Sequence, residues 1–258
     1  MDPKKYWDAR LKKYCNLRGV GYLSGDEYFN KYLYKAKVRT LERVIRKFNI
    51  SFENKEILDV GSGIGFWIDY YLSKNASLIW GVDISSEAIR YLSKKYADQN
   101  RVKLSEGDFS NLSLNKKFDI VNAFDVSYHV CDDTLWNKFV ENLCKHVKEF
   151  GFIFISDTFR EDYRSDIVHV KFRPLIAYER IFRKYGIQII SLIPMYSILG
   201  GPFTGRQKID RLFWIIHTLF VFASRCKLLA NFLYFIDSLL IHLKPFGIST
   251  KLLVVQKT

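Results

Sequence analysis

The chain lacks the features that define several protein classes. Its 258 residues include four cysteines (Cys15, Cys131, Cys144 and Cys226), which are scattered and form no Cys-x-x-Cys pair. The sequence therefore indicates neither a disulfide framework nor a cysteine-based zinc site. No apolar run follows the first residues, as it would in a signal peptide. We expect a reduced, metal-free, cytoplasmic protein.

Apolar runs long enough to cross a membrane are also missing. The uninterrupted run Leu212–Ala223 contains His217 and is too short to span a bilayer, which needs about 20 apolar residues. Hydrophobic residues nevertheless make up 48% of the sequence, so a sizeable core is expected. The length fits one α/β domain with additions.

Short apolar runs alternate with segments of helical spacing. The predicted strands are 56–60, 78–83, 102–106, 118–124, 151–156, 187–193 and 251–256, and the predicted helices are 26–48, 64–74, 85–97, 134–148 and 175–185. Ser85 or Ser86 can cap the helix at 85, and Asp132 or Asp133 the helix at 134. This alternation predicts a mostly parallel sheet with helices on both faces, with ligands bound at the carboxyl ends of its strands.

The most informative segment is the run from Ile57 to Phe66. An apolar strand with Asp59 near its end is followed by glycines at 61, 63 and 65, with Ser62 between the first two. Glycines permit a sharp turn and close approach of a ligand to the backbone. The start of the next helix offers free N–H groups and a positive dipole end. Together these features predict a binding site for a nucleoside-type cofactor.

The glycine spacing disfavours a dinucleotide. In a Gly-x-Gly-x-x-Gly fingerprint the last glycine would stand where Phe66 does. A carboxylate such as Asp59 suits a ligand with a positive end better than a pyrophosphate. The run resembles the Asp-x-Gly-x-Gly-x-Gly motif of class I S-adenosylmethionine-dependent methyltransferases. An NAD-dependent oxidoreductase is the remote alternative.

The following strands extend this resemblance in the family's order. Asp83 ends the second strand and is followed by Ile84; a carboxylate here can accept both ribose hydroxyls. The resemblance implies that Asp108, after the third strand, faces the adenine amino group and that the backbone N–H of Phe109 lies near the ring. Asp125 ends the fourth strand, beside the expected entry of the methyl acceptor. The family also implies a Rossmann-like sheet of seven strands, the last one antiparallel.

Two histidines are candidates for a catalytic base. His129 follows the fourth strand, and a near-neutral pKa suits proton removal from an acceptor. His169 follows the fifth strand in a segment rich in charge. His129 can equally line the site or cap the next helix, and no cluster of acidic metal ligands is visible.

The charge of the chain is concentrated in its flanks. The net charge is +13; residues 1–50 contribute +8 and residues 205–258 contribute +6, whereas residues 51–204 carry −1. Such charge favours solubility, or attraction to phosphate in a nucleotide-sugar, a lipid-linked acceptor, an anionic membrane or RNA. We expect residues 1–50 to form a helical cap over the cofactor cleft, in which Tyr6, Trp7 and Arg10 either close over the cofactor carboxylate or belong to a plain amphipathic helix.

The most individual part of the chain is a long insertion before the last strand, at about 195–249. Two segments of helical spacing lie near 209–220 and 229–243. As helices, both would have apolar side chains around more of their circumference than a single stripe. A helix of that kind must be buried somewhere. It can form a cap on the 51–258 methyltransferase domain, a dimer interface, or a basic amphipathic pair at the membrane periphery.

The function predicted from the sequence is a methyltransferase that uses S-adenosylmethionine and yields S-adenosylhomocysteine. The expected acceptor is an oxygen or nitrogen of a small-molecule or glycan-like compound, with a phosphate-bearing one left open. The alternatives are an RNA methyltransferase or a membrane-associated enzyme with a lipid-linked acceptor. RNA is disfavoured because no dedicated RNA-binding module is visible.

Overall fold

The computed structural model describes residues 2–160, 169–197, 215, 217–218, 221–222, 226–241 and 250–258. By its internal contacts the chain divides into two compact units. We call Met1–Lys13, Ser51–Leu192 and Leu253–Thr258 the sheet unit, and Tyr14–Ile50 and Ile193–Leu252 the flanking unit.

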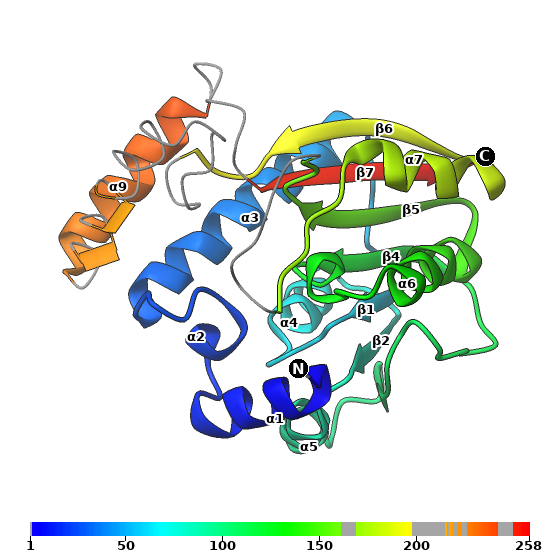
Figure 1. Cartoon of the computed structure of the whole chain (residues 1–258), viewed down its shortest axis with the longest axis horizontal. Coiled ribbons are helices and arrows are strands. Elements are labelled where there is room, and N and C mark those ends of the chain that lie inside the picture. The colour runs from blue at the N-terminus through cyan, green and yellow to red at the C-terminus, as the bar shows by residue number, and fades with distance from the viewer. Residues whose placement is uncertain are drawn as a thin grey trace. The chain divides into compact units, whose positions relative to one another are not determined.

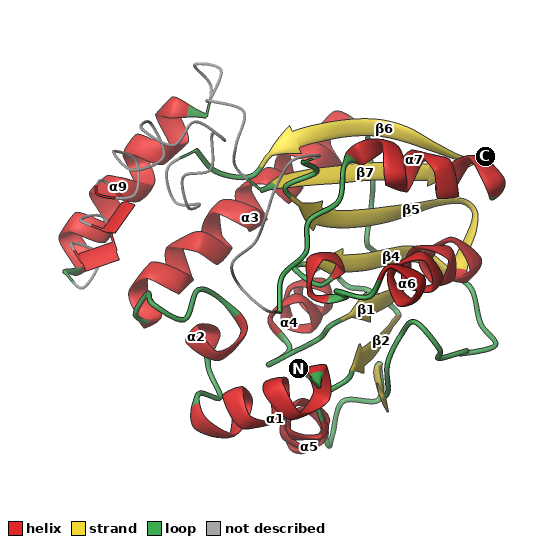
Figure 2. Ribbon diagram, viewed as in Figure 1, coloured by secondary structure: helices red, strands yellow, loops and turns green. Residues whose placement is uncertain are grey.

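One seven-stranded sheet has the order β3-β2-β1-β4-β5-β7-β6 (Figures 1 and 2). Its strands are β1 (Glu56–Val60), β2 (Leu78–Asp83), β3 (Val102–Glu106), β4 (Phe118–Phe124), β5 (Val147–Asp157), β6 (Ile187–Pro194) and β7 (Lys251–Lys257). The first five pair in parallel, with β1 between β2 and β4. All seven predicted strands are confirmed.

The last strand runs against its neighbour β6. The N–H of Met195, after β6, donates to the carbonyl of Thr250, just before β7. At the other end, the N–H of Thr258 donates to the carbonyl of Gly186, just before β6. Each strand's end therefore meets the other's start, which is the antiparallel arrangement implied by the family resemblance.

The described part of the sheet unit also contains five α-helices, of which all but α1 lie between strands in the chain. They are α1 (Pro3–Lys13), α4 (Phe66–Ser73), α5 (Ser86–Lys95), α6 (Asp133–His146) and α7 (Leu175–Lys184), with a 3₁₀ turn, η1, at Ser127–His129. The caps are Ser85, whose hydroxyl accepts from the N–H of Ala88, and Asp132, whose carboxylate accepts from the N–H of Leu135. These contacts decide between the two capping residues predicted for each helix.

Two boundaries differ from the predicted ones. The helix expected from residue 64 begins at Phe66, because Gly63 and Gly65 have left-handed φ angles of 54° and 80°. The strand expected from residue 151 begins at Val147. The pairing of β4 and β5 shifts between Phe118 and Ile120, and Phe150, with φ of 61°, bulges outward. A bulge adds residues to one strand without ending the pairing.

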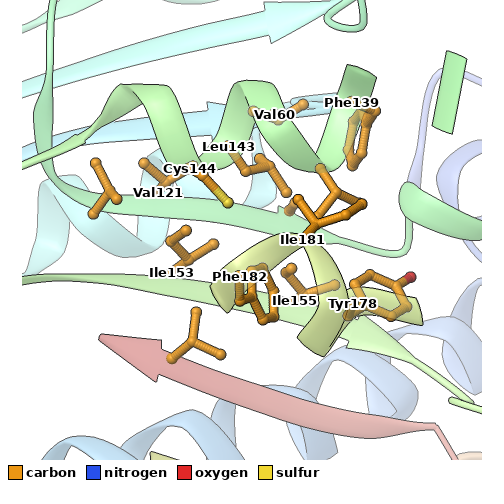
Figure 3. Close-up of a cluster of buried hydrophobic side chains, with 14 of the residues drawn as sticks. Val60, Val121, Phe139, Leu143, Cys144, Ile153, Ile155, Tyr178, Ile181 and Phe182 are labelled. Atoms are coloured by element: carbon orange, nitrogen blue, oxygen red, sulfur yellow. The ribbon is translucent and has the colours of Figure 1, made fainter. Parts of the chain in front are cut away.

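The core of the sheet unit lies where α6 and α7 cover β4 and β5 (Figure 3). Leu143 and Cys144 of α6 and Tyr178 and Phe182 of α7 are buried against Ile153 and its neighbours. The apolar side chains of each helix follow a 3.6-residue period and so form one buried face. This packing holds the carboxyl ends of β4 and β5 in place.

The flanking unit contains α2 (Leu17–Val20), α3 (Glu27–Lys47) and α9 (Lys227–Leu240). The predicted helix 26–48 is confirmed as α3, whereas most of the predicted segment 209–220 lies outside the described residues. The internal contacts place α1 in the sheet unit and α2 and α3 in the flanking unit. That residues 1–50 form one helical cap over the cofactor cleft stays a prediction. No helix in the described part of the chain is long and apolar enough to cross a bilayer.

Candidate functional site

The glycine loop after β1 folds back onto β2. The N–H groups of Gly61 and Ser62 both donate to the carbonyl of Val82, at 2.8 and 3.1 Å. Gly61 has a φ of 75°, and a Cβ built on it would lie 2.3 Å from a methyl group of Val126. Both the backbone angle and the close approach require glycine at this position.

Asp83, at the end of β2, ties this loop to α5. Its Oδ2 accepts from the N–H of Gly63 at 2.8 Å, and its Oδ1 accepts from the N–H of Ser85 at 2.8 Å. Its side chain is almost buried, and burial raises the pKa of this carboxyl although the backbone hydrogen bonds oppose the rise. The carboxylate thus lies between the glycine loop and the start of α5, the position predicted for a nucleoside contact.

Asp59 lies beneath the loop rather than at its surface. It is completely buried, and its Oδ1 accepts from the side-chain amide of Asn122 at 2.6 Å. Its Oδ2 has no hydrogen-bond partner within the described residues. Burial raises the pKa of Asp59 to about 7, with a smaller contribution from the charge of Asp83. A positive charge near this oxygen would offset the cost of burying it.

Asp108 forms the turn after β3. Its Oδ1 accepts from the N–H of Ser110 at 2.9 Å, which is the pattern of an Asx turn. The next side chain, Phe109, is 4% exposed and packs on Phe139 in the core, while its carbonyl accepts from the amide of Asn142. Packing and hydrogen bonding on both sides therefore hold the Asp108–Phe109 backbone at the strand end.

Helix α1 is anchored on the carboxyl ends of β2 and β3. The carboxylate of Asp8 accepts from the hydroxyl of Ser85 at 2.6 Å and from the N–H of Glu87 at 3.3 Å, at the N-terminus of α5. A carboxylate is favourable there because it meets the positive end of the helix dipole. Lys4 also pairs with Glu106 at the end of β3. These contacts place α1 beside the motif residues.

Asp157, a buried acid at the end of β5, fixes the turn that follows β4. Asp125 adopts a left-handed φ of 61°, and its N–H donates to the hydroxyl of Ser156. In η1, Ser127 donates to Oδ2 of Asp157 at 2.7 Å, and the hydroxyl of Tyr178 donates to the same oxygen at 2.6 Å. Burial raises the pKa of Asp157 to about 6. Asp157, at the end of β5, therefore holds η1, which carries His129.

The two predicted catalytic histidines lie together. Their rings are stacked, with centroids 5.6 Å apart and planes 10° from parallel. Nδ1 of His129 lies 2.9 Å from the carbonyl oxygen of His169. Because a carbonyl can only accept, Nδ1 carries the proton and Nε2 of His129 keeps its lone pair. Burial lowers the pKa of His129 to about 4, so the ring is neutral at physiological pH.

Aromatic side chains of α1 complete this cluster. The hydroxyl of Tyr6 lies 3.1 Å from Nε2 of His169, and Nη1 of Arg10 donates to that hydroxyl at 3.0 Å. Trp7 meets the ring of His129 edge-on at 5.0 Å. Burial and the charge of Arg10 lower the pKa of His169. Tyr6, Trp7 and Arg10 thus belong to a helix and also contact the predicted catalytic residues.

Every predicted site residue belongs to the sheet unit, and two contacts join predicted residues directly, Asp83 with Gly63 and His129 with His169. Sequence reasoning missed Asp8 and Asn122 and did not assign Asp157 a positioning role. The sequence could have indicated a role for Asn122, because it is an amide in the otherwise apolar second half of β4. Nothing in the sequence indicates a role for Asp8, because its partners lie about 80 residues away in the chain. Among the described residues, no three His, Cys, Asp or Glu side chains form a possible metal site.

Comparison with known proteins identifies related sequences. Residues 57–151 match the family model for a methyltransferase domain. The phosphoethanolamine N-methyltransferase of Plasmodium falciparum is 22% identical over 158 residues, covering 61% of this chain and 55% of that protein. This chain thus spans about half the length of that curated relative.

Solved structures share the fold. Magnesium protoporphyrin IX methyltransferase from Synechocystis PCC 6803, with bound SAM, superposes with a TM-score of 0.60 and 13% identity, covering 100% of this chain and 98% of that one. The N-methyltransferase NodS from Bradyrhizobium japonicum, in complex with S-adenosylhomocysteine, gives a TM-score of 0.57 at 12% identity, covering 75% and 90%.

Proposed function

We propose that this chain, which belongs to the class I S-adenosylmethionine-dependent methyltransferase family, transfers a methyl group from S-adenosylmethionine to an oxygen or nitrogen of a small-molecule or glycan-like acceptor. The single observation that carries the proposal is the contact between Asp83 and Gly63, which joins the ends of β1 and β2 at a buried carboxylate. That arrangement is suited to a nucleoside beside a glycine loop.

The residues present fit S-adenosylmethionine chemically. Asp83 is the proposed acceptor for the ribose hydroxyls, with Ile84 following it, and Asp108 with the N–H of Phe109 is proposed for the adenine. The loop from Gly61 to Gly65 is proposed to hold the methionine end. The buried Oδ2 of Asp59, with no hydrogen-bond partner in the described part of the chain, favours a cationic ligand over pyrophosphate.

Calorimetry with S-adenosylhomocysteine tests this assignment. We expect the wild-type protein to bind it and Asp83→Ala to weaken binding at least about 100-fold, since a buried charged hydrogen-bonding group is lost. Asp98→Ala, at an exposed position beyond α5, is the matched control and should bind normally. Absence of binding by the wild-type chain would overturn the proposal.

The chain's own residues have to orient the acceptor and accept its proton. When bound, S-adenosylmethionine supplies an electrophilic methyl on a sulfonium, with a neutral thioether as leaving group. The bond formed would join the acceptor oxygen or nitrogen to the methyl carbon, and the bond broken would be the one between that carbon and sulfur. For a hydroxyl acceptor we propose that Nε2 of His129 takes the proton, because Nδ1 already donates to the carbonyl of His169.

The tautomer of His129 can be measured without knowing the acceptor. We expect ¹⁵N NMR to show a neutral ring protonated on Nδ1 that titrates only near pH 4. A ring protonated on Nε2 would remove His129 as the proposed base and leave His169, whereas a ring titrating near its ordinary pKa of about 6.5 would contradict the burial of His129. His146, whose Nδ1 lies 2.8 Å from the carbonyl of Asn142 away from the cluster, is the internal reference.

A further inference from the structure

The flanking unit exposes an unusual number of large apolar side chains. On α9, Leu228, Phe232, Phe235 and Leu239 are 80%, 58%, 57% and 48% exposed. Their spacing of four, three and four residues places them on one side of the helix. Contiguous apolar surface of this kind marks an interaction site in a folded protein. We call these four residues the α9 apolar stripe.

The opposite side of α9 is buried and contains one carboxylate among apolar side chains. Ala230, Asp237 and Ile241 are at most 8% exposed. Asp237 accepts from Arg39 of α3 at 3.2 Å and from the N–H of Ser197 at 2.7 Å. An ordinary surface helix buries its apolar side and exposes its polar side. Helix α9 instead has apolar side chains on both sides: a charged contact helps to hold one side on α3, and the α9 apolar stripe faces outward.

The same unit carries most of the net positive charge of the chain. Residues 14–50 and 193–252 contain 15 Lys and Arg against 5 Asp and Glu, which gives +10 of the total +13. Lys31 and Lys35 are exposed one turn apart on α3. Nζ of Lys35 lies 4.5 Å from the ring of Tyr234 on α9, so positive charge adjoins the helix that carries the stripe.

We propose that the flanking unit docks on the surface of an anionic lipid bilayer, with the α9 apolar stripe entering the interface and the cations of the unit attracted to the headgroups. An apolar stripe combined with cationic charge is the pattern of interfacial helices, which lie on a membrane without crossing it. A second copy of this chain is the poorer occupant, because two units of +10 repel each other.

Vesicle flotation with the full chain tests the proposal. Vesicles of phosphatidylcholine alone are compared with vesicles containing about 30% phosphatidylglycerol. Each lysine near an anionic surface contributes about 1 kcal/mol, which is about fivefold in partitioning. We therefore expect Lys31→Glu/Lys35→Glu to lower binding at least about 30-fold, since both attractions are lost and two repulsive charges are added, and raised salt to weaken binding of the wild-type chain.

A second variant, Phe232→Ser/Phe235→Ser, tests the apolar contribution. It should lower partitioning of the chain onto vesicles about 100-fold, since each phenylalanine contributes about tenfold when buried. The matched controls lie in the sheet unit: Phe150→Ser/Ile176→Ser removes two exposed apolar side chains, and Lys94→Glu/Lys138→Glu reverses two exposed charges. Both controls should float like the wild-type chain. Circular dichroism and thermal melts verify that each variant is folded.

Three results would overturn the proposal. They are no flotation of the wild-type chain with anionic vesicles at low salt, equal binding to neutral vesicles, or losses as large in the control variants. Light scattering that shows a dimer dissociated by Phe232→Ser/Phe235→Ser, without vesicle binding, would assign the stripe to a second copy. Because S-adenosylhomocysteine binding is measured separately, failure of membrane docking and failure of the proposed catalytic function are distinguishable.

Discussion

The helices on the sheet and helix α9 of the flanking unit differ in how they place their apolar side chains. In the sheet unit, α6 and α7 bury their apolar faces on β4 and β5, and among its described residues only Tyr91, Phe150 and Ile176 are large exposed hydrophobics. In the flanking unit, α9 buries a carboxylate and exposes its apolar stripe. The sheet unit therefore satisfies its own hydrophobic pattern, whereas the flanking unit needs something outside the described structure to cover its stripe.

Charge separates the two units as well. The sheet unit carries 25 Lys and Arg against 22 Asp and Glu, a net of +3, and the flanking unit carries +10. A nearly balanced surface around a buried acidic site suits a small ligand, while a concentrated positive field suits a large anionic surface. We therefore expect that binding of the proposed cofactor and docking of the whole chain can be changed independently.

The largest expected effect is in the glycine loop of the sheet unit. Gly61→Ala should destabilise the protein by about 3 kcal/mol, because a left-handed alanine costs about 1–2 kcal/mol and the clash with Val126 adds to it. Gly186→Ala is the control, since its φ is 65° but its Cβ would have no neighbour closer than 3.8 Å. Urea unfolding that gives equal losses at both positions would show that the clash is unimportant.

A change in the flanking unit should leave the sheet unit intact. Asp237→Ala removes one partner of a buried ion pair and should cost about 2–3 kcal/mol, reduced because Arg39 is partly exposed. Hydrogen-exchange mass spectrometry should show lost protection in α3 and α9. Ser238→Ala, next on the same helix, should change little. Loss of S-adenosylhomocysteine binding in Asp237→Ala would contradict the independence of the two units.

The smallest effect concerns the buried acid of the sheet unit and depends on pH. The folded-state pKa of Asp59 is about 7, above the value of about 3.9 in an unfolded chain, so the folded protein binds more protons between these values. The stability of the wild-type protein should therefore fall as pH rises from about 4 to about 7. Asp59→Asn does not titrate, and its stability relative to wild type should rise by about 2 kcal/mol between pH 4 and pH 6.

Urea unfolding at pH 4, 6 and 8 measures this difference. S-adenosylhomocysteine binding should weaken in Asp59→Asn, because the negative charge proposed to favour the cationic ligand is lost. The exposed Asp98→Asn is the control and should show neither change. A stability difference that does not vary with pH would mean that Asp59 is ionised throughout in the folded state.

The sheet was predictable because its information is local. Strands β1, β2 and β4 are mostly apolar runs that end near an acid or a glycine, and all seven strands were predicted within a few residues of their observed bounds. The bulge at Phe150 was not predicted, since it depends on the register between β4 and β5. Of the candidate site, the motif residues were predicted by position, but their roles stay predictions.

The sequence by itself determined the order of the strands and helices, the glycine loop, and the acids that follow the strands, because apolar periodicity and glycine placement act over a few residues. Only the tertiary structure decided that Asp59 is buried on Asn122, that His129 stacks on His169 beneath Tyr6 and Trp7, and that α9 exposes its apolar side. Those outcomes depend on contacts between residues far apart in the chain, which no local pattern specifies.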